Sequence, residues 1–418
     1  MMMGYRMALG VVLILVVGAF AVACDGNGVT TTTKAITPAT GTVSTSTTGP
    51  SSEPFKVAVI VSLTGPDSAA GASVLNGVKL EIDALNAAGG IEGRRIEYTV
   101  QDDKTDMAAA MSAVELALSE GVDAVIGPLP QSTATPAREL CEKAGVVNIG
   151  FGPATLAELV AGTEYRCTFL ISMGADAVAD AWIKAFSIEG AKNIVCIGDQ
   201  NPLHQDALSL LPDLAKVAGI AVTIVPDAWS PRTTDDYTPF IKKIAAEAEE
   251  TTPDAILVAG DPIASSNIYA GLRAQGVIVP VIGSPAAAAP ATLLADLEKS
   301  EGFMPIGPGV VDPTVLPDGY PGRAAYVDFA TRYGTAYGKS PAVHAGLGHD
   351  AVHVLALGLK AGGDDPAKVA AGVEAIKDFQ GMQGVFTFSA IDHVGIHKGL
   401  ALWKVTRGLF TFVASLNQ

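Results

Sequence analysis

Short β-branched runs alternate with longer helical stretches from Phe55 onward, and this alternation constrains the fold more than any other feature of the chain. The first run, 56–61, is typical of a buried strand. Apolar residues then recur at helical spacing until Gly89-Gly90 ends the helix, at Val74, Leu75, Val78, Ile82 and Leu85. Further strands are predicted at 96–100, 122–126, 146–149, 193–197, 221–225, 254–258 and 279–282, and further helices at 107–119, 236–249 and 264–274. Strands that alternate with helices predict an α/β fold of doubly wound parallel sheets, covered by helices on both faces.

The length and the charge of the chain set two further limits. The roughly 365 residues from Phe55 onward exceed one typical hydrophobic core and predict two lobes. With 27 Lys+Arg against 43 Asp+Glu, the net charge is −16, and no basic cluster stands out in the sequence. Proteins that recognise nucleic acid or anionic lipid headgroups do so from a positively charged surface. The composition therefore argues against nucleic acid as a partner and against a polybasic lipid-binding surface.

The first 24 residues predict where the protein works. Arg6 precedes an uncharged apolar run, 8–22, which ends at Ala23-Cys24. A short positive region, an apolar core of about 7–15 residues and small residues at the cleavage point are typical of a secretory signal peptide, here 1–23. The run is too short for a membrane-spanning helix, which needs about 20 apolar residues.

Cys24 is the predicted point of attachment to a membrane. Together with Ala21-Val22-Ala23 it resembles the lipobox of bacterial lipoproteins, which implies that Cys24 is acylated and becomes the mature N-terminus. The segment 24–54 is rich in Thr, Ser, Gly and Pro, and cannot bury enough apolar surface to stay ordered. We therefore expect a disordered tether that keeps the body outside the cytoplasm and next to the cell membrane. Ordinary cleavage, with Cys24 removed or incidental, and a terminal tail without function are the alternatives.

Three further cysteines, Cys141, Cys167 and Cys196, have neither the even number nor the CxxC spacing of a disulfide framework or a zinc site. One pair among them is compatible with a location outside the cytoplasm, but the spacing does not identify it. Cys196 stands in a predicted strand, where a cysteine usually packs as a small buried hydrophobe.

Parallel α/β sheets bind ligands outside the carboxyl ends of their strands, so the loops that lead from strand to helix are the candidate site. The loop 127–136 contains Gln131 and Ser132. The hydroxyl groups of this loop, with the free N–H groups of the next helix, can hold a carboxylate, although helix capping explains the same residues equally well. The next loop, 150–155, begins like a dinucleotide-binding loop, but Thr155 stands at the third glycine position and the chain has no P-loop lysine. A nucleotide cofactor is not expected.

Metal and catalytic sites are not predicted either. His349 and His353 are four residues apart, on one face of a helix, but Asp350 breaks the metalloprotease pattern and nothing fixes a third ligand. The aspartates within 102–106 fit a solvated turn better than a calcium loop, which needs more oxygen ligands at fixed spacing. The sequence also lacks the GxSxG nucleophile motif. Catalytic residues, metals and cofactors are therefore not expected.

A set of short motifs runs through the body in a fixed order: LTGP at 63–66, NAAGGIEGR at 86–94, DD at 102–103, VIGP at 125–128, DY at 236–237, HDAV at 349–352 and FQGMQG at 379–384. Together these motifs resemble the leucine/isoleucine/valine-binding family of periplasmic solute-binding proteins. The resemblance implies a type I periplasmic-binding-protein fold, with two α/β lobes joined by three crossovers. These would fall near Leu170, Pro305 and Phe388, giving lobe 1 as 55–170 with 306–388 and lobe 2 as 171–305 with 389–418.

The resemblance also implies which residues bind the ligand. In amino-acid-binding relatives, hydroxyl and backbone groups of the first lobe bind the carboxylate and the ammonium group of the ligand. The matching positions here are Gln131 or Ser132 and the turn of Gly152, Pro153 and Thr155, with Thr155 the best match. Thr64 in the first lobe, with Leu203 and Asp261 in the second, completes the set of expected ligand-binding residues.

Three positions of the binding site depart from the pattern of the family. Ala70 and Leu203 stand where relatives have tyrosines, and Pro285 stands where they have the carboxylate that pairs with the ammonium group of the ligand. Asp261 can replace that carboxylate, because an ammonium group in a closed cleft needs a charged or well-bonded partner. Capping of the helix that follows is the equally good alternative for Asp261.

The sequence thus predicts a monomeric, lipid-anchored solute-binding protein outside the cytoplasm, which performs no chemistry itself. Its expected ligand is a branched-chain or other amino acid, and its expected partner is the permease of an ABC importer. One alternative is a sensor, in which the closed state of the same trap is passed to a signalling protein. Another is a different ligand, because the missing tyrosine and carboxylate leave room for an amide, an aromatic acid or another carboxylate.

Overall fold

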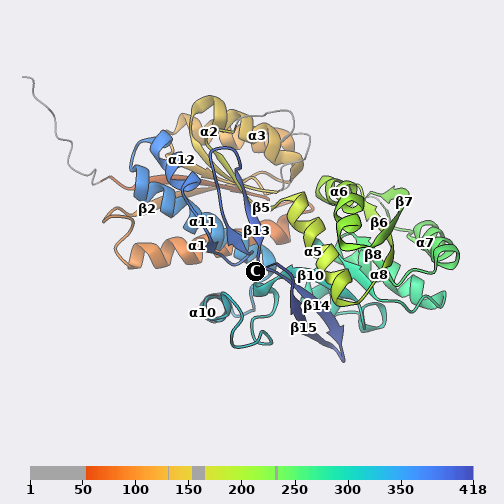
Figure 1. Ribbon diagram of the computed structural model, residues 1–418. Coiled ribbons are helices and arrows are strands. Elements are labelled where there is room, and N and C mark those ends of the chain that lie inside the picture. The colour runs from red at the N-terminus through yellow and green to blue at the C-terminus, as the bar shows by residue number, and fades with distance from the viewer. Residues whose placement is uncertain (1–52, 130, 153–164, 231–233, 418) are drawn as a thin grey trace, which may run out of the picture. The chain divides into compact units, whose positions relative to one another are not determined.

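The computed structural model describes residues 53–129, 131–152, 165–230 and 234–417, which Figure 1 shows as ribbons. They form two α/β lobes, each built on one sheet. The predicted signal peptide, Cys24 and nearly all of the predicted tether lie outside the described residues. No helix in the described part of the chain is both long enough and apolar enough to cross a membrane.

The first lobe contains an eight-stranded sheet in the order β11-β12-β13-β5-β4-β3-β1-β2. Its strands are β1 (Phe55–Val61), β2 (Ile96–Asp102), β3 (Ala124–Ile126), β4 (Val147–Phe151), β5 (Thr168–Met173), β11 (Phe379–Gln380), β12 (Val385–Phe386) and β13 (Val394–Lys398). Neighbouring strands are parallel, apart from β12, which is antiparallel to both β11 and β13.

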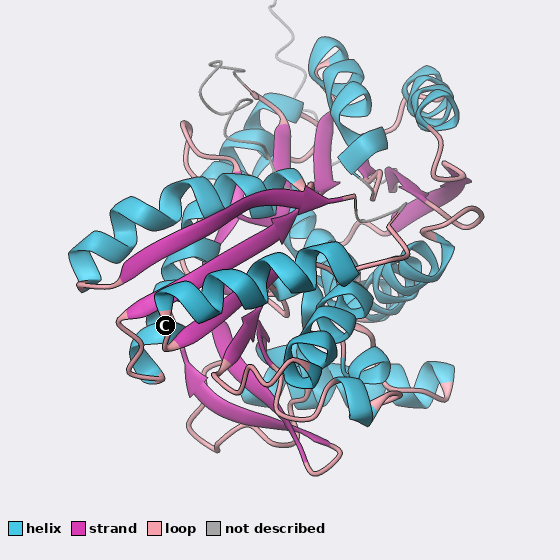
Figure 2. Cartoon of the chain, turned by 90° about the vertical axis from the view of Figure 1, so that its right-hand side faces the viewer, coloured by secondary structure: helices cyan, strands magenta, loops and turns pink. Residues whose placement is uncertain are grey.

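Helices cover both faces of this sheet because side chains alternate along each strand. Val57 and Val59 of β1 pack against α1, α11 and α12, whereas Ala58 and Ile60 pack against α2 and α3. Figure 2 shows helices on both sides of the strands. The helices of this lobe are α1 (Ser68–Ala87), α2 (Met107–Ser119), α3 (Gln131–Ala144), α10 (Arg323–Tyr337), α11 (Val343–Gly362) and α12 (Pro366–Glu374).

The second lobe contains a seven-stranded sheet in the order β15-β14-β10-β9-β8-β6-β7, in which β14 is antiparallel to β10 and β15. Ile256 and Val258 of β8 pack towards α7 and α8, whereas Leu257 packs towards α5 and α6. The strands are β6 (Asn193–Asp199), β7 (Ala221–Trp229), β8 (Ala255–Ala259), β9 (Val281–Gly283), β10 (Met304–Pro308), β14 (Leu400–Thr406) and β15 (Leu409–Ser415). The helices are α5 (Ala175–Ile188), α6 (Pro202–Ala218), α7 (Thr238–Thr251), α8 (Pro262–Ala274) and α9 (Pro290–Leu293).

The chain passes between the two sheets three times. Each passage lies further along the sequence than the position expected for it. The first passage follows β5, and the second follows β10, which still belongs to the second sheet. The third differs most from the expected position near Phe388, because β13 pairs in parallel with β5 and so keeps residues 394–398 in the first sheet. Gly399 alone then separates β13 from β14.

The three cysteines of the body are free and buried. Cys196 lies in β6 and is fully buried. The Sγ atom of Cys167 lies 3.8 Å from the carbonyl oxygen of Cys141. Burial raises the pKa of both of these thiols to about 12, so neither is a reactive thiolate at neutral pH.

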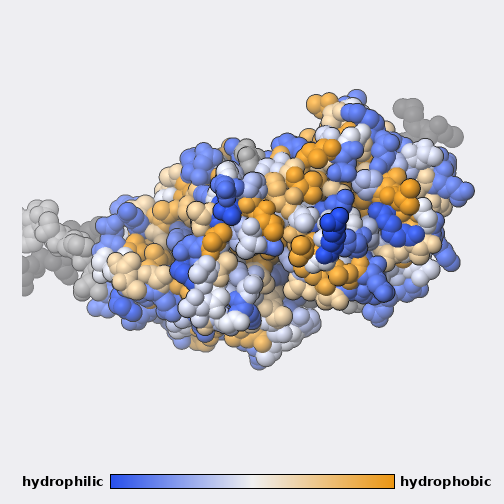
Figure 3. Space-filling view, turned by 90° about the horizontal axis from the view of Figure 1, so that it is seen from below, coloured by the Kyte–Doolittle hydropathy of each residue, from blue (hydrophilic) through white to orange (hydrophobic). Residues whose placement is uncertain are grey.

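Apolar side chains also reach the surface. Figure 3 shows one face of the molecule, on which hydrophobic side chains are interspersed with hydrophilic ones. The exposed large apolar residues of the described chain include Val217, Ile278 and Ile391. Isolated exposed apolar side chains are common in folded proteins, so these residues alone indicate no function.

Candidate functional site

The carboxyl ends of β1 and β2 meet in the first lobe, and two aspartates hold the loop between β1 and α1. Asp102 accepts hydrogen bonds from the amides of Leu63 (2.8 Å) and Thr64 (3.2 Å) and from the Thr64 hydroxyl (2.7 Å). Asp103 accepts a hydrogen bond of 2.5 Å from the hydroxyl of Ser62. Burial alone would raise the pKa of Asp102, but the hydrogen bonds from the Thr64 hydroxyl and from backbone amides lower it to about 2. Thr64 is thus exposed at a strand end, with its hydroxyl proton directed to Asp102.

The loop between β3 and α3 approaches β1 closely. Gly127 has φ +106°, and a Cβ atom there would lie 1.9 Å from the carbonyl oxygen of Ile60, so only glycine fits. The side chain of Asn148 donates a hydrogen bond of 2.8 Å to the carbonyl oxygen of Gly127 and so fixes the loop. Gln131 and Ser132 form the first turn of α3, at the carboxyl end of β3, but their side chains lie outside the described part of the structure.

A buried arginine that the sequence interpretation missed supports the end of β4. Arg138 of α3 is fully buried, and its Nη2 atom donates to the carbonyl oxygens of Phe151 (3.1 Å) and Gly152 (3.0 Å). Gly152 has φ +92° and ends the described part of this loop, so Pro153 and Thr155 lie outside it. The guanidinium group of Arg138 therefore places a positive charge directly behind the predicted carboxylate-binding loop.

In the second lobe, β6 ends in a buried aspartate–histidine pair that the sequence interpretation also missed. Oδ1 of Asp199 lies 2.6 Å from Nδ1 of His204, and both side chains are 2% exposed. The same oxygen accepts a hydrogen bond from the amide of Asn201, whose own side chain caps α6 by accepting from the amide of Leu203. Leu203 is half-buried in the first turn of α6. An aspartate at a strand end with a histidine in the next helical turn is the sequence signal that could have identified this pair.

Asp261 lies where β8 leads into α8, and it caps this helix as the alternative interpretation of the sequence proposed. Its Oδ1 atom accepts hydrogen bonds from the amides of Ile263 (2.8 Å) and Ala264 (2.9 Å). Burial raises the pKa of Asp261, the two amides oppose this shift, and the nearby charge of Asp199 adds to it. Only one of its two oxygens is used by the cap, so capping leaves the other able to accept from a ligand.

The loop after β9 contains Pro285, which occupies the first position of a short 3₁₀ helix. The hydroxyl of the buried residue before it, Ser284, donates a hydrogen bond of 2.7 Å to the carbonyl oxygen of Gly260 and so joins this loop to the end of β8. Two buried polar atoms near Gly260, Nε1 of Trp229 and Oγ of Ser265, have no hydrogen-bond partner within the described chain. The strand ends of this lobe thus combine acidic side chains with buried polar groups that can form further hydrogen bonds.

His349 and His353 lie on α11 rather than at these strand ends. No third ligand could be named from the sequence, and in the structure Glu81 of α1 lies beside them. The three residues are taken up separately below.

Comparison with known proteins identifies the family to which this chain belongs. The chain is a member of the periplasmic binding protein family, whose family model matches residues 54–408. This is a family of extracytoplasmic binding proteins, the curated relatives that match are binding proteins rather than enzymes, and the two-lobed α/β fold is the one predicted from the sequence.

Individual relatives agree with this assignment. The Leu/Ile/Val-binding protein of Escherichia coli (strain K12) is 32% identical over 109 residues, which are 26% of this chain and only 29% of the length of that relative. The branched-chain amino acid transporter substrate-binding protein LivJ of Streptococcus pneumoniae, solved with isoleucine, shares the fold with a TM-score of 0.68 at 24% identity, over 86% of this chain and 99% of its own. A solute-binding protein of an ABC transporter from R. palustris, solved with benzoate, has a TM-score of 0.69 at 19% identity, over 87% of this chain and 96% of its own.

Proposed function

We propose that the chain is the substrate-binding component of an ABC importer and that it captures a small amino acid at the strand-end loops of its two lobes. The observation that carries this proposal is the placement of one cationic side chain behind the Gly152 loop of the first lobe and of two carboxylates at strand ends of the second lobe. Arg138 lies behind the Gly152 loop of the first lobe, whereas Asp199 and Asp261 lie at the strand ends of the second. A zwitterion complements both, with its carboxylate at the first lobe and its ammonium group at the second.

The relatives support a carboxylate-bearing ligand and leave the ammonium group to be tested. The Escherichia coli protein is named for three branched-chain amino acids, and the Streptococcus pneumoniae protein was solved with isoleucine. The R. palustris protein was solved with benzoate, which has a carboxylate and no ammonium group. Asp261 favours an amino acid over an aromatic acid, because a second carboxylate near benzoate would repel it.

A ligand screen on the full-length chain tests this proposal. We expect leucine, isoleucine or valine to raise the unfolding temperature, since a ligand at 100 times its Kd stabilises a protein by about 2.7 kcal/mol. Two analogues of leucine isolate its charged groups: leucinamide keeps only the ammonium group, and 4-methylpentanoate keeps only the carboxylate. Both should bind much more weakly than leucine by calorimetry. If 4-methylpentanoate or benzoate binds as tightly as leucine, the protein is a carboxylate-binding protein and the amino-acid assignment is wrong.

The role in transport needs a separate test, because ligand binding alone does not distinguish an importer from a sensor. We expect cells that lack this chain to lose uptake of the identified ligand, and the unaltered chain to restore it. Unchanged uptake together with loss of a ligand-dependent signalling response would instead support the sensor. Anchoring through an acylated Cys24 is part of the same proposal, since it would keep the binding protein close to its permease.

A further inference from the structure

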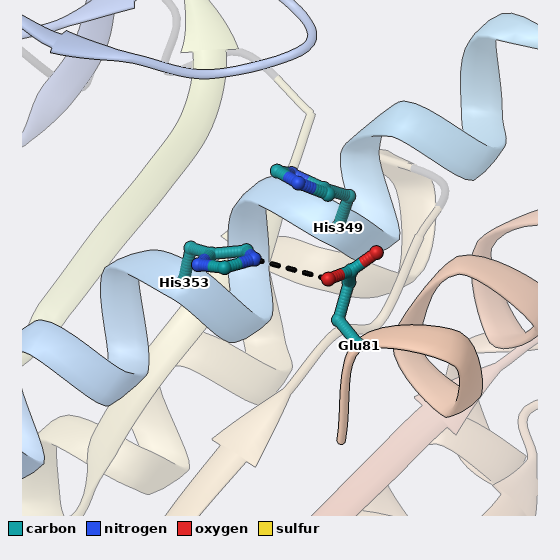
Figure 4. A group of neighbouring side chains, drawn as sticks. All are labelled: Glu81, His349 and His353. Atoms are coloured by element: carbon teal, nitrogen blue, oxygen red, sulfur yellow. Dashed lines mark hydrogen bonds and ion pairs between the residues drawn. The ribbon is translucent and has the colours of Figure 1, made fainter. Parts of the chain in front are cut away.

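Three side chains outside the ligand-binding loops, one glutamate and two histidines, are of the types that bind metal ions. Glu81 comes from α1, and His349 and His353 come from successive turns of α11, as Figure 4 shows. One ligand atom from each residue lies within 4.8 Å of the other two. The Nε2 atom of His353 lies 3.1 Å from Oε2 of Glu81, and the two imidazole centroids are 4.3 Å apart.

These distances are close to those of a tetrahedral zinc site. Zinc binds imidazole nitrogen and carboxylate oxygen at about 2.0–2.2 Å, which puts neighbouring ligand atoms about 3.3–3.6 Å apart. The contact between His353 and Glu81 is already near this value. His349 then needs a shift on the order of 1 Å, which a small side-chain rotation supplies.

The hydrogen bonds of His349 prepare it for metal binding. Its Nδ1 atom lies 2.9 Å from Oδ1 of the fully buried Asp350. That carboxylate also accepts from the amides of Met382 (2.7 Å) and Gln383 (2.8 Å), so it is firmly held. Because a carboxylate accepts, Nδ1 carries a proton, and in the neutral imidazole Nε2 then has the free lone pair. A carboxylate that fixes the tautomer of a histidine in this way is the usual support of a metal-bound imidazole.

The group also contains more carboxylates than guanidinium groups. Glu81 and Asp350 are both buried, and the exposed Asp328 lies nearby on α10. One guanidinium group, that of Arg332, serves two of these carboxylates, with bonds of 2.8 Å to Glu81 and 2.7 Å to Asp328. Buried charges in proteins are usually paired or bound to metal ions. Glu81 shares its guanidinium partner with Asp328, so a metal ion bound at Oε2 of Glu81 would add a second positive charge to a carboxylate that has no cation of its own.

We propose that Glu81, His349 and His353 bind one divalent transition-metal ion of the zinc type, with the remaining coordination position open to water. Glu81 would bind through Oε2 and keep Oε1 on Arg332. His353 is 30% exposed and Arg332 33% exposed, so the ion has a path from solvent. His353 must give up its Nε2 proton, or transfer it to Nδ1, before it can coordinate. The bound ion would fasten α1 to α11 within the first lobe.

Zinc binding to the full-length, untagged chain, stripped with a chelator and purified in detergent, tests the proposal. We expect calorimetry with ZnCl₂ to give one ion per chain, and zinc to raise the unfolding temperature. His353→Gln should weaken zinc binding at least tenfold and abolish the temperature shift. The matched control is His397→Gln, because His397 is 31% exposed and paired with Asp392 in the same way, and this variant should bind zinc like the unaltered chain.

His349→Gln should also weaken zinc binding, but the buried position of His349 means that the variant can fail to fold. His353→Gln avoids this difficulty, since its partly exposed side chain leaves the core unchanged. The proposal is overturned if the unaltered chain binds no stoichiometric zinc. Equal zinc affinity in the unaltered chain, His353→Gln and His397→Gln would overturn it as well, because the ion would then lie elsewhere on the surface.

Discussion

The substitution Asp261→Asn separates the two roles of Asp261, helix cap and charge partner of a ligand. Asn caps helices about as well as Asp, so its side-chain oxygen should still accept from the amides of Ile263 and Ala264. Burial raises the pKa of Asp261 in the folded protein. A carboxyl group whose pKa is higher in the folded protein than in the unfolded chain stabilises the fold while it is protonated, that is, below its unfolded pKa of about 3.9. This stabilisation is lost as the pH rises through its pKa in the folded protein. Removing this charge should therefore leave the free energy of unfolding at pH 7 unchanged or slightly higher.

The same substitution should strongly weaken the binding of an amino acid. Two unit charges 4 Å apart attract each other by about 4 kcal/mol at an effective dielectric constant near 20. The amide keeps a neutral acceptor, so we expect a loss of about 2–4 kcal/mol, equivalent to a Kd roughly 30- to 900-fold higher. In the unaltered protein, leucine affinity should fall as the pH is lowered towards the raised pKa of Asp261, because protonation removes the same charge.

Calorimetry with leucine at pH 7 measures this effect, and Asp365→Asn provides the control. Asp365 caps α12 and also precedes a proline, and it accepts from the amides of Ala367 (3.1 Å) and Lys368 (3.3 Å). We expect this variant to keep both its stability and its leucine affinity. If Asp261→Asn binds leucine as tightly as Asp365→Asn does, Asp261 is only a helix cap and the ammonium group has another partner.

The remaining predictions concern anchoring, the first-lobe site and its support. Cys24→Ser should release the protein from membranes, and sedimentation with membranes at high salt would contradict the lipid anchor. Ser132→Ala and Thr155→Ala should each weaken ligand binding by about 1–3 kcal/mol, the cost of leaving a desolvated polar group unpaired. Unchanged calorimetric affinity in both variants would place the pocket elsewhere. Arg138→Met should destabilise the protein by about 2–4 kcal/mol, because the carbonyl oxygens at 151–152 lose a buried donor. A urea midpoint equal to that of the unaltered chain would refute this account of Arg138.

The regular elements of the fold could be predicted because their signals are local. The helix expected at 107–119 has these bounds in the structure, and the strand expected at 56–61 begins one residue earlier, at Phe55. The position of the third passage between the sheets was harder to predict. It depends on the pairing of Val394 with Leu170, which are far apart in the sequence, and no periodicity within one segment reports such a pairing.

In the candidate site, too, contacts between residues that are close in the sequence could be predicted, whereas contacts between distant residues could not. Capping by Asp261 could be predicted, because it depends on amides two and three residues away. The role of Arg138 depends on carbonyl groups 13 and 14 residues away, on the far side of a strand. Glu81 lies 272 residues from His353, so only the folded chain brings the two together.

Because Gly399 is the single residue between β13 and β14, the chain cannot be shortened at this point without moving one of the two strands. Leu402 of β14 packs on one face of the second sheet and Trp403 on the other, both without exposure to solvent. Deleting Gly399 would pull one of the two strands along its neighbours by one residue. In β14 this slip would place the indole of Trp403 where the smaller Leu402 now lies, and every other side chain of the strand would change faces with them. Loops usually absorb changes in chain length during evolution, but at this point any shortening must be absorbed by the two sheets.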